Sequence, residues 1–288
     1  MKHVFIVNPV AGNGKYLETV KKIEDACAEE KLDYVIHYTK GPKDATEIAL
    51  SYKNDHVIIF GVGGDGTLSE VINGIVETKN ILGIIPCGSG NDFYKCLDDV
   101  DQLYKTIDLG RINGKYFINI VSVGIDSEVG HNANIFRKKF IPRKQIYNLS
   151  VLYTLFLYKS KKLKFEFNLK EQEGNFTIVT VCNGRYYGGG YNIAPTAKID
   201  DHLFDVYFVK KMSKFKMPSA IMKMKKGDHE NEVYVTKEQT DMIRIRGEHK
   251  LICNVDGETL IDDNFYIELV KDALTIYNNK KLINKILK

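Results

Sequence analysis

A glycine-rich segment with one carboxylate carries the strongest chemical signal in the chain. It reads Gly61-Val62-Gly63-Gly64-Asp65-Gly66-Thr67 and lies between an apolar run at 57–60 and a helical pattern. Glycines let a backbone approach a ligand closely, and N–H groups at the start of a helix bind anions. A carboxylate beside a phosphate would repel it unless a cation such as Mg²⁺ lies between them. The segment therefore indicates a nucleotide polyphosphate with a metal ion, and phosphoryl transfer.

Two other interpretations of this segment stay open at the level of residues. A glycine cluster after a strand can be only a tight connection. The same residues also satisfy the G-x-G-x-x-G pattern of dinucleotide sites. That pattern normally follows the first strand of its unit, whereas here it follows the third expected strand.

Two further small-residue segments also follow expected strands. The first reads Asn8-Pro9-Val10-Ala11-Gly12, and the second reads Pro86-Cys87-Gly88-Ser89-Gly90-Asn91-Asp92-Phe93. Each could be structural, the first as a strand-to-helix turn and the second as a helix N-cap at Asn91 or Asp92. Since carboxyl ends of parallel strands meet at one edge of a sheet, three such segments together indicate a ligand site.

An acidic turn, Asp256-Gly257-Glu258, separates two strand patterns near the end of the chain. Asp-Gly is a strong signal for a type I′ hairpin, which needs no further role. Either carboxylate could instead accept a proton from an attacking hydroxyl, a task that depends first on placement.

The elements that must position these segments change character along the chain. Up to about residue 122, short apolar strands at 4–7, 34–37, 57–60 and 81–85 alternate with helical patterns at 14–31, 43–53 and after the glycines. This alternation predicts a doubly wound parallel α/β sheet. Beyond it, alternating strand patterns recur at 116–123, 163–169, 176–182, 203–209, 242–246, 251–255, 266–270 and 274–277. They predict an antiparallel β domain over 123–278, with 279–288 packing back on a first domain of 1–122.

Composition narrows the class of protein. The chain has 288 residues, 44% apolar, with a net charge of +4, and its five cysteines form no C-x-x-C pair. It therefore lacks the pattern of a disulfide framework or zinc site, and a reducing cytoplasm is the expected setting. No apolar stretch reaches the roughly 20 residues of a membrane span, so we expect a protein that is soluble or attached to a membrane surface.

Taken together and in order, the motifs resemble the diacylglycerol kinase catalytic family. The resemblance includes Asn8-Pro9, the Gly63-to-Thr67 segment with Glu70 and Asn73-Gly74, the Gly88-to-Phe93 segment and Asp256-Gly257-Glu258. It covers nearly the whole chain. It implies an N-terminal domain like those of NAD kinases and phosphofructokinases, a C-terminal β domain, and ATP in a cleft between them.

The resemblance also assigns roles to individual residues. Asp65 would join the Mg²⁺ and phosphate network, and Asp256 or Glu258 would be the catalytic base, with Asp65 a weaker candidate. Asp126 would line the cleft. The residues expected to bind the nucleotide are Asn8, Pro9, Val10, Ala11, Gly12, Thr39, Gly63, Gly64, Asp65, Gly66, Thr67, Leu68, Ser69, Ser89, Asn91 and Asp92. Ser89 stands where many members have Thr and keeps the hydroxyl.

A structural magnesium loop is implied at residues 197–203. The matching ligands are the Asp201 side chain and the carbonyls of Lys198 and Leu203. His202 replaces the usual glycine, which puts the loop geometry in question. By chemistry alone, Asp200-Asp201 before a strand is typical of a solvated turn.

Two basic segments could meet a membrane. Residues 136–164 hold nine Lys or Arg around an apolar stretch at 146–158, and residues 210–226 hold seven Lys and four Met; neither contains an acid. Such clusters are attracted to anionic lipid, although 146–158 could equally be a core helix. No nucleic-acid motif accompanies them.

We therefore expect an ATP- and Mg²⁺-dependent lipid kinase that is cytoplasmic and bound peripherally to anionic phospholipid. Its acceptor would be a lipid hydroxyl, and a homodimer is possible. The alternatives are a kinase of a soluble substrate such as NAD, and a lipid- or nucleotide-binding protein without catalysis.

Overall fold

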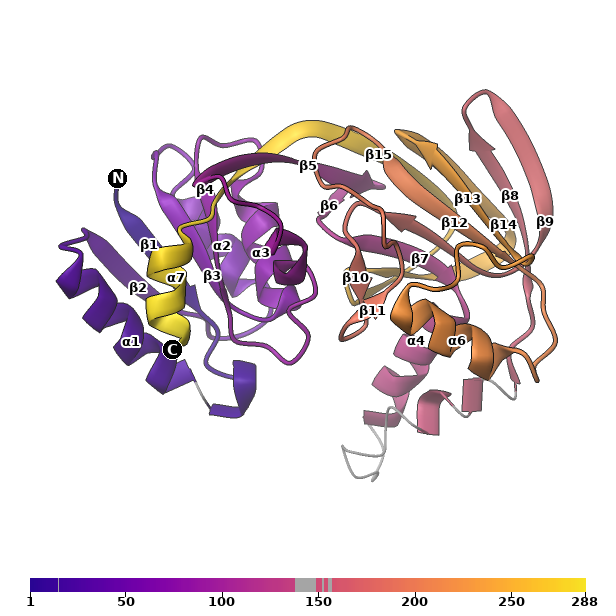
Figure 1. Ribbon diagram of the computed structural model, residues 1–288, viewed down its shortest axis with the longest axis horizontal. Coiled ribbons are helices and arrows are strands. Elements are labelled where there is room, and N and C mark those ends of the chain that lie inside the picture. The colour runs from indigo at the N-terminus through magenta and orange to yellow at the C-terminus, as the bar shows by residue number, and fades with distance from the viewer. Residues whose placement is uncertain (15, 138–148, 152, 155–156) are drawn as a thin grey trace. The chain divides into compact units, whose positions relative to one another are not determined.

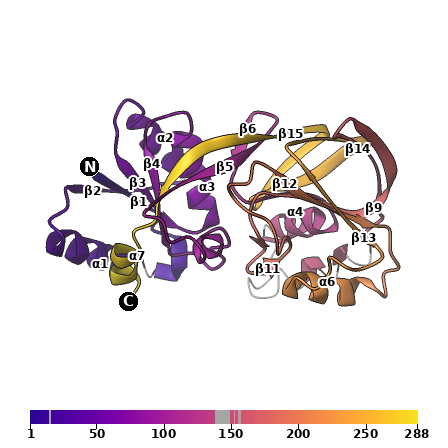
Figure 2. The same ribbon diagram turned by 45° about the horizontal axis from the view of Figure 1, so that its top comes forward.

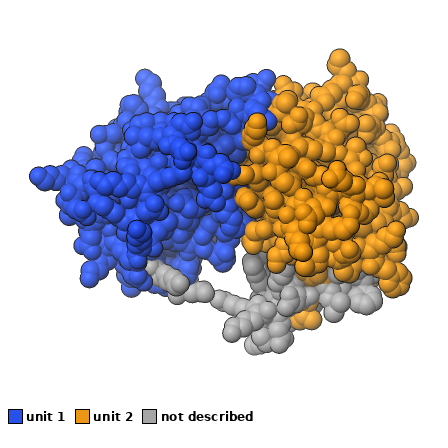
Figure 3. Space-filling model, viewed as in Figure 1, with its two compact units in different colours: residues 1–109, 199–202, 270–288 blue, residues 110–198, 203–269 orange. Residues whose placement is uncertain are grey.

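The computed structural model describes residues 1–14, 16–137, 149–151, 153–154 and 157–288, which form two compact units (Figures 1 and 3). Unit 1 comprises Met1–Leu109, Ile199–His202 and Val270–Lys288, and unit 2 comprises Gly110–Lys198 and Leu203–Leu269. The boundary expected at 122/123 falls inside a strand of unit 2, because the chain passes between units within two long strands. These are β5 (Tyr104–Ile112) and β15 (Glu258–Tyr277). The chain also returns to unit 1 for the short segment Ile199–His202.

Unit 1 contains the parallel sheet that the alternating pattern predicted. Its strands are β1 (His3–Val7), β2 (Tyr34–Tyr38), β3 (Ile58–Gly63) and β4 (Ile81–Pro86), in the order β4-β3-β1-β2. The last residues of β15 add a further parallel strand beside β4, with Ile276 opposite Leu82. The strands are almost continuously apolar because helices cover both faces.

The two faces of this sheet are covered by different helices (Figure 2). Phe5 and Val7 of β1 pack in one cluster with residues of α1 (Tyr16–Glu29) and α7 (Lys280–Leu287). Since side chains alternate along a strand, Val4 and Ile6 face the opposite side. There α2 (Asp44–Ser51) contacts β1, and α3 (Asp65–Ile75) contacts β3 and β4. Two short 3-10 turns, at Ala11–Gly14 and Tyr94–Leu97, complete the unit.

Unit 2 is built on antiparallel strands, as expected. They are β6 (Lys115–Phe117), β7 (Ile120–Gly124), β8 (Lys161–Phe167), β9 (Lys170–Cys182), β12 (Phe204–Lys210), β13 (Val235–Thr240) and β14 (Met242–Val255), with a small hairpin of β10 (Tyr186–Tyr187) and β11 (Tyr191–Asn192). The order runs β13-β12-β9-β7-β14-β15, while β8 pairs with both β9 and β14. Among the described residues, helices α4 (Ile125–Arg137) and α6 (Met217–Lys226) connect strands of this unit.

Several expected strands were wrong in extent. The pairs 242–246 with 251–255 and 266–270 with 274–277 are single strands, β14 and β15. The pairing of β14 with β15 continues past the polar residues of β14 through a register shift between Arg246 and Leu251. Conversely, 116–123 is broken at Ile118 and Asn119, whose N–H groups bind the Asp256 carboxylate. Strand β5 was not anticipated.

Unit 2 packs apolar side chains on both faces of its sheet. One cluster contains the aromatic rings of Phe165, Phe208 and Phe265, all nearly inaccessible to solvent. The other includes Tyr207 and is closed by Met224 of α6. All five cysteines of the chain are free thiols.

Candidate active site

Three loops of unit 1 meet at the carboxyl ends of neighbouring parallel strands. They follow β1, β3 and β4, which lie side by side in the order β4-β3-β1. The amide of Asn8 donates to the Thr67 hydroxyl at 2.9 Å, and the Cys87 N–H donates to the Gly63 carbonyl at 2.8 Å. The structure therefore joins the three segments that the sequence singled out separately. One detail was wrong: Gly61, Val62 and Gly63 belong to strand β3, and the loop begins at Gly64.

Glycine is required where two of these loops touch. A Cβ built on Gly88 would lie 2.4 Å from the Cα of Gly64, and one on Gly63 would lie 2.4 Å from the Thr67 hydroxyl. Both distances are far below van der Waals contact, so any larger residue would force the loops apart. The absence of side chains at these glycines therefore lets the backbones of the β3 and β4 loops lie in direct contact, an arrangement suited to a phosphate cradle.

Helix α3 begins at Asp65, immediately after Gly64 at its N-cap. The first N–H groups of a helix have no acceptor within the helix, and the helix dipole adds positive potential there. Gly64 offers no side chain to cap them. The start of α3 can therefore receive an anionic group.

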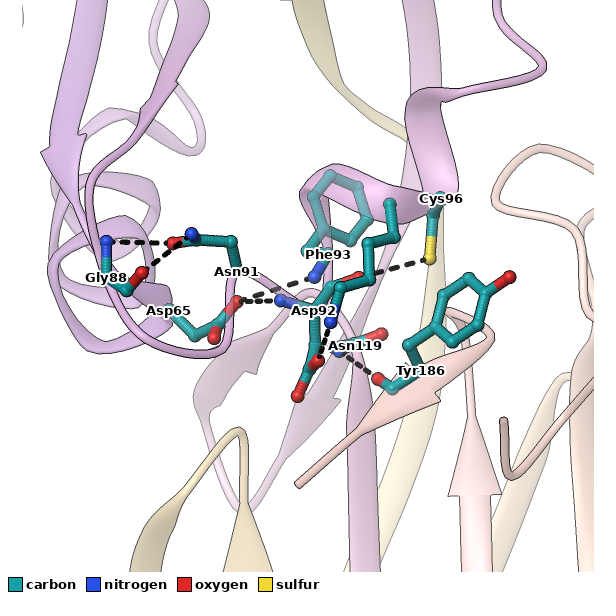
Figure 4. Close-up of polar contacts among 9 residues, drawn as sticks. Asp65, Gly88, Asn91, Asp92, Phe93, Cys96, Asn119 and Tyr186 are labelled. Atoms are coloured by element: carbon teal, nitrogen blue, oxygen red, sulfur yellow. Dashed lines mark hydrogen bonds and ion pairs between the residues drawn. The ribbon is translucent and has the colours of Figure 1, made fainter. Parts of the chain in front are cut away.

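The Asp65 carboxylate braces the neighbouring loop. Its Oδ1 accepts from the N–H groups of Asp92, at 2.8 Å, and of Phe93, at 3.4 Å (Figure 4). Within the same loop Asn91 closes a ring with Gly88, accepting from its N–H at 3.0 Å and donating to its carbonyl at 2.8 Å. Asp65 thus determines where the β4 loop lies.

The surroundings of Asp65 disfavour its negative charge. Burial raises its pKa above the ordinary value, and the nearby Asp92 raises it further, although hydrogen bonds from Phe93 and Asp92 oppose the change. Asp92 itself is buried and pairs with Lys95 at 2.8 Å. A second positive group near these two carboxylates, such as a divalent cation, would relieve their repulsion.

The expected nucleotide residues all lie in unit 1, but not all can offer a side chain. Thr67, Leu68 and Ser69 are buried at the start of α3, where the Thr67 hydroxyl already accepts from the Asn8 amide. Val10 and Ser89 are exposed, and the Thr39 N–H donates to the Val7 carbonyl at 2.9 Å beside the end of β1. A recess opens between the loops and is lined by Gly61, Gly63, Gly64, Asp65, Leu68, Ile84, Pro86, Asn91 and Tyr94. Sequence reasoning missed Ile84 and Tyr94, of which only Tyr94, next to the Asn-Asp-Phe motif, gave a signal.

The acidic turn lies in unit 2, and its two carboxylates, Asp256 and Glu258, have different contacts. Asp256 and Gly257 have φ values of 47° and 94°, as a type I′ turn requires. The Asp256 carboxylate accepts from three backbone N–H groups, of Ile118 at 2.7 Å, Asn119 at 3.0 Å and Ile120 at 2.9 Å. Asp256 is therefore occupied in holding the turn against the start of β7.

Glu258 is placed differently. Its side chain is 51% exposed, and its polar contact is an ion pair with Lys115. An exposed carboxylate can reach a ligand that Asp256 cannot. The sequence left the two acids equivalent, and their contacts favour Glu258 as the proton acceptor.

Asp126, the further acid singled out in the sequence, lies in the first turn of helix α4 in unit 2. It accepts hydrogen bonds from the hydroxyls of Ser122 and Ser127. Burial raises its pKa, and the two serine hydroxyls oppose that change.

The expected magnesium loop keeps its turn despite His202. His202 has φ of 64°, the left-handed conformation that glycine adopts most easily, so the imidazole does not exclude the expected backbone path. The Asp201 carboxylate and the carbonyls of Lys198 and Leu203 are hard oxygen donors of the kind that Mg²⁺ binds. The donor chemistry of this loop fits the ion.

The loop is also held by a buried carboxylate of β5. Asp108, 1% exposed, accepts from the His202 N–H at 2.8 Å and from its Nδ1 at 3.0 Å, and from the Asp272 N–H at 2.9 Å. Asp108, His202 and Asp272 form the one group of three possible metal-ligating side chains in the described part of the chain. Asp108, the buried residue of the three, already accepts hydrogen bonds from N–H donors. We therefore interpret the group as a set of contacts that holds the loop in place.

Comparison with known proteins identifies the family. Residues 2–115 match the diacylglycerol kinase catalytic domain, and residues 119–278 match the YegS C-terminal NAD kinase beta sandwich-like domain. The chain belongs to the bacterial diacylglycerol kinase and YegS-like lipid kinase family. Both domain types expected from the motifs are thereby confirmed, a catalytic α/β domain and a β-rich C-terminal domain.

Individual relatives of this family member agree with the assignment. It is 25% identical to a diacylglycerol kinase of Bacillus subtilis over 88% of both chains. It is 28% identical to a probable lipid kinase YegS-like of Chromohalobacter salexigens, over 76% of this chain and 75% of that one. A crystal structure of a diacylglycerol kinase from Bacillus anthracis superposes with a TM-score of 0.72 and 26% identity, covering 98% of each chain.

Proposed function

We propose that this protein is an ATP- and Mg²⁺-dependent lipid kinase that phosphorylates the hydroxyl of diacylglycerol or a related lipid. The product would be a lipid phosphate such as phosphatidic acid. The observation that carries this proposal is the junction of three loops rich in small residues with the start of α3, where Asp65 holds the β4 loop. This arrangement supplies backbone N–H groups and a helix N-terminus for phosphates, beside a carboxylate suited to a metal-bound nucleotide.

The reaction transfers one phosphoryl group. The lipid hydroxyl oxygen forms a bond to the γ-phosphorus, the bond from that phosphorus to the β–γ bridging oxygen breaks, and ADP leaves. Glu258 takes the hydroxyl proton, for which its exposure suits it better than the occupied Asp256. The loop N–H groups stabilise negative charge on the phosphates, which is the main contribution in such catalysis. Mg²⁺, when bound, would neutralise part of the phosphate charge.

A lipid acceptor determines where the enzyme must act. A lipid with long acyl chains resides in a bilayer, so the enzyme must work at a membrane surface. No helix in the described part of the chain is long and apolar enough to cross a membrane. We therefore propose peripheral attachment to anionic phospholipid.

Transfer of labelled γ-phosphate from Mg-ATP to diacylglycerol in mixed micelles tests the proposal. The panel should include a sphingoid base, a polyprenol and NAD, with Glu258→Gln as the inactive variant and the exposed Glu171→Gln as its matched control. We expect transfer to a lipid by the parent and by Glu171→Gln but not by Glu258→Gln. Transfer to NAD alone would favour the soluble-substrate alternative, and nucleotide binding without any transfer would favour a non-catalytic protein.

A further inference from the structure

One surface of unit 2 combines a fully exposed aromatic ring with lysines. Phe215 is 96% exposed, an uncommon state for so large an apolar side chain. The residues from Lys211 to Lys226 include six lysines and no acid. Lys211, Lys214 and Lys216, on either side of Phe215, are exposed. We call Phe215 with these three lysines the Phe215 patch.

The backbone of the patch is held in place by the fold. The Lys216 N–H donates to the Ser213 carbonyl at 2.9 Å, which closes a turn around Phe215. The Lys211 N–H donates to the Asn175 carbonyl of β9 at 3.0 Å, and helix α6 begins at Met217. Phe215 thus lies, exposed, in a hydrogen-bonded turn between β12 and α6.

Helix α6 shows why Phe215 is not simply part of the core. The helix buries Met217, Ala220 and Met224 against unit 2, and its outer side carries Met222, 55% exposed. The core of unit 2 therefore contains the apolar residues on the inner side of α6. Phe215 precedes the helix and contributes nothing to that packing, so its exposure has no explanation from folding.

We propose that the Phe215 patch docks the protein on an anionic lipid bilayer, with the ring inserted among the lipids and the lysines on the headgroups. Charge complementarity selects this occupant, because positive side chains near a membrane are attracted to acidic headgroups. An aromatic ring adds affinity by leaving water for the interfacial region. This inference rests on the proposed function only in that both require the protein to bind a membrane. Vesicle binding can be measured without ATP.

The chain offers a clean probe because it contains no tryptophan. Phe215→Trp places the protein's single tryptophan in the patch, where excitation at the red edge of its absorption avoids the tyrosines. Leu169→Trp is the matched control, since Leu169 is also fully exposed in unit 2, at the β8–β9 hairpin, where one lysine, Lys170, stands beside two acids, Glu166 and Glu171. The vesicles are pure phosphatidylcholine and phosphatidylcholine with phosphatidylglycerol.

We expect Phe215→Trp emission to shift to the blue and to be quenched by brominated lipid on the anionic vesicles only, with the shift reversed by high salt. Leu169→Trp should not change. Replacing Lys214 and Lys216 by Gln in the Phe215→Trp protein should weaken vesicle binding about tenfold or more. An equal shift on neutral vesicles, an equal shift of Leu169→Trp, or vesicle binding without a Phe215→Trp shift would overturn the proposal.

A second readout separates docking from catalysis. Phe215→Ser should lose lipid phosphorylation on anionic vesicles but retain transfer to a water-soluble short-chain diacylglycerol. If Phe215→Trp inserts as expected while the protein phosphorylates no lipid, the docking surface stands and the proposed kinase activity fails. If the parent phosphorylates lipid on vesicles and Phe215→Ser does so equally well, the patch is not the docking surface.

Discussion

At the scale of single residues, the two acids of the Asp256-Gly257-Glu258 turn have separate tasks. The Asp256 carboxylate accepts hydrogen bonds from three backbone N–H groups, whereas Glu258 makes an exposed ion pair with Lys115. Contacts of a carboxylate with backbone donors stabilise the fold, and an exposed carboxylate contributes little to it.

We therefore expect Glu258→Gln to lower phosphoryl transfer by about 100-fold or more with an unchanged melting temperature. Asp256→Ala should instead destabilise the fold by about 2–4 kcal/mol, since it leaves three N–H groups without their acceptor. Steady-state kinetics and thermal unfolding of both variants check this. A stable, inactive Asp256→Ala protein beside an active Glu258→Gln protein would reverse the assignment.

The raised pKa of Asp65 leads to a second prediction at this scale, on how the free energy of unfolding depends on pH. Burial raises the pKa of Asp65 above its ordinary value of 3.8, so the folded state holds the proton more tightly than the unfolded state does. Stability from this group is therefore fully present below pH 3.8 and is lost as the pH rises through the folded pKa.

Asp65→Asn keeps an oxygen for the Asp92 and Phe93 N–H groups but removes the charge. We expect it to be more stable than the parent at pH 7, by no more than about 1 kcal/mol because solvent reaches the site. The gain should disappear near pH 3.8. Phosphoryl transfer should fall sharply. Denaturant unfolding between pH 3.5 and 7 measures the difference, and a gain that persists in acid would contradict this account.

At the scale of elements, the contact between the β3 and β4 loops depends on glycine. Gly88→Ala would bring a Cβ to 2.4 Å from the Gly64 Cα, whereas a Cβ on Gly41 would meet nothing within 4 Å. Overpacking of this kind costs about 1–3 kcal/mol.

We expect Gly88→Ala to weaken ATP binding markedly, because the loop must move away from the start of α3, and to lower stability by that amount. Gly41→Ala is the control and should match the parent in both. Calorimetric titration with Mg-ATP and thermal unfolding report the two effects. Parent-like ATP affinity in Gly88→Ala would show that the loop contact does not shape the site.

At the scale of the whole molecule, the chain returns to the unit in which it began. Helix α7, the last element, packs Leu282, Ile283 and Ile286 in the cluster formed by α1 and the parallel sheet. Unit 1 is thus assembled from both ends of the chain, and its site depends on a segment far away in sequence.

Adjacent residues of α7 test this dependence. Ile286 is 1% exposed and Leu287 is 39% exposed. Ile286→Ala should destabilise unit 1 by about 2–4 kcal/mol, and Leu287→Ala by less than about 1 kcal/mol. Hydrogen exchange of the β1 and β3 amides would show where protection is lost. Equal effects of the two substitutions would mean that α7 does not stabilise the sheet.

The sequence by itself determined the local chemistry and the class of each half. The glycine loops, the alternation of buried strands with helices, and the Asp-Gly turn all follow from residue types over a few positions. For this reason the parallel pairing of the first sheet and the φ values of Asp256 and Gly257 agree with expectation. Local preference also explains the misjudged strand lengths, because the polar residues inside β14 and β15 look like turns without their partner strands.

Only the tertiary structure decided which of these residues act together. Nothing near Asp65 in sequence shows that its carboxylate holds the N–H groups of Asp92 and Phe93, or that Asp256 is occupied by the start of β7. The same is true of His202, whose imidazole meets Asp108 of β5. Such contacts join positions tens of residues apart, so they depend on strand order and register, which are set by packing of the whole core rather than by any local pattern.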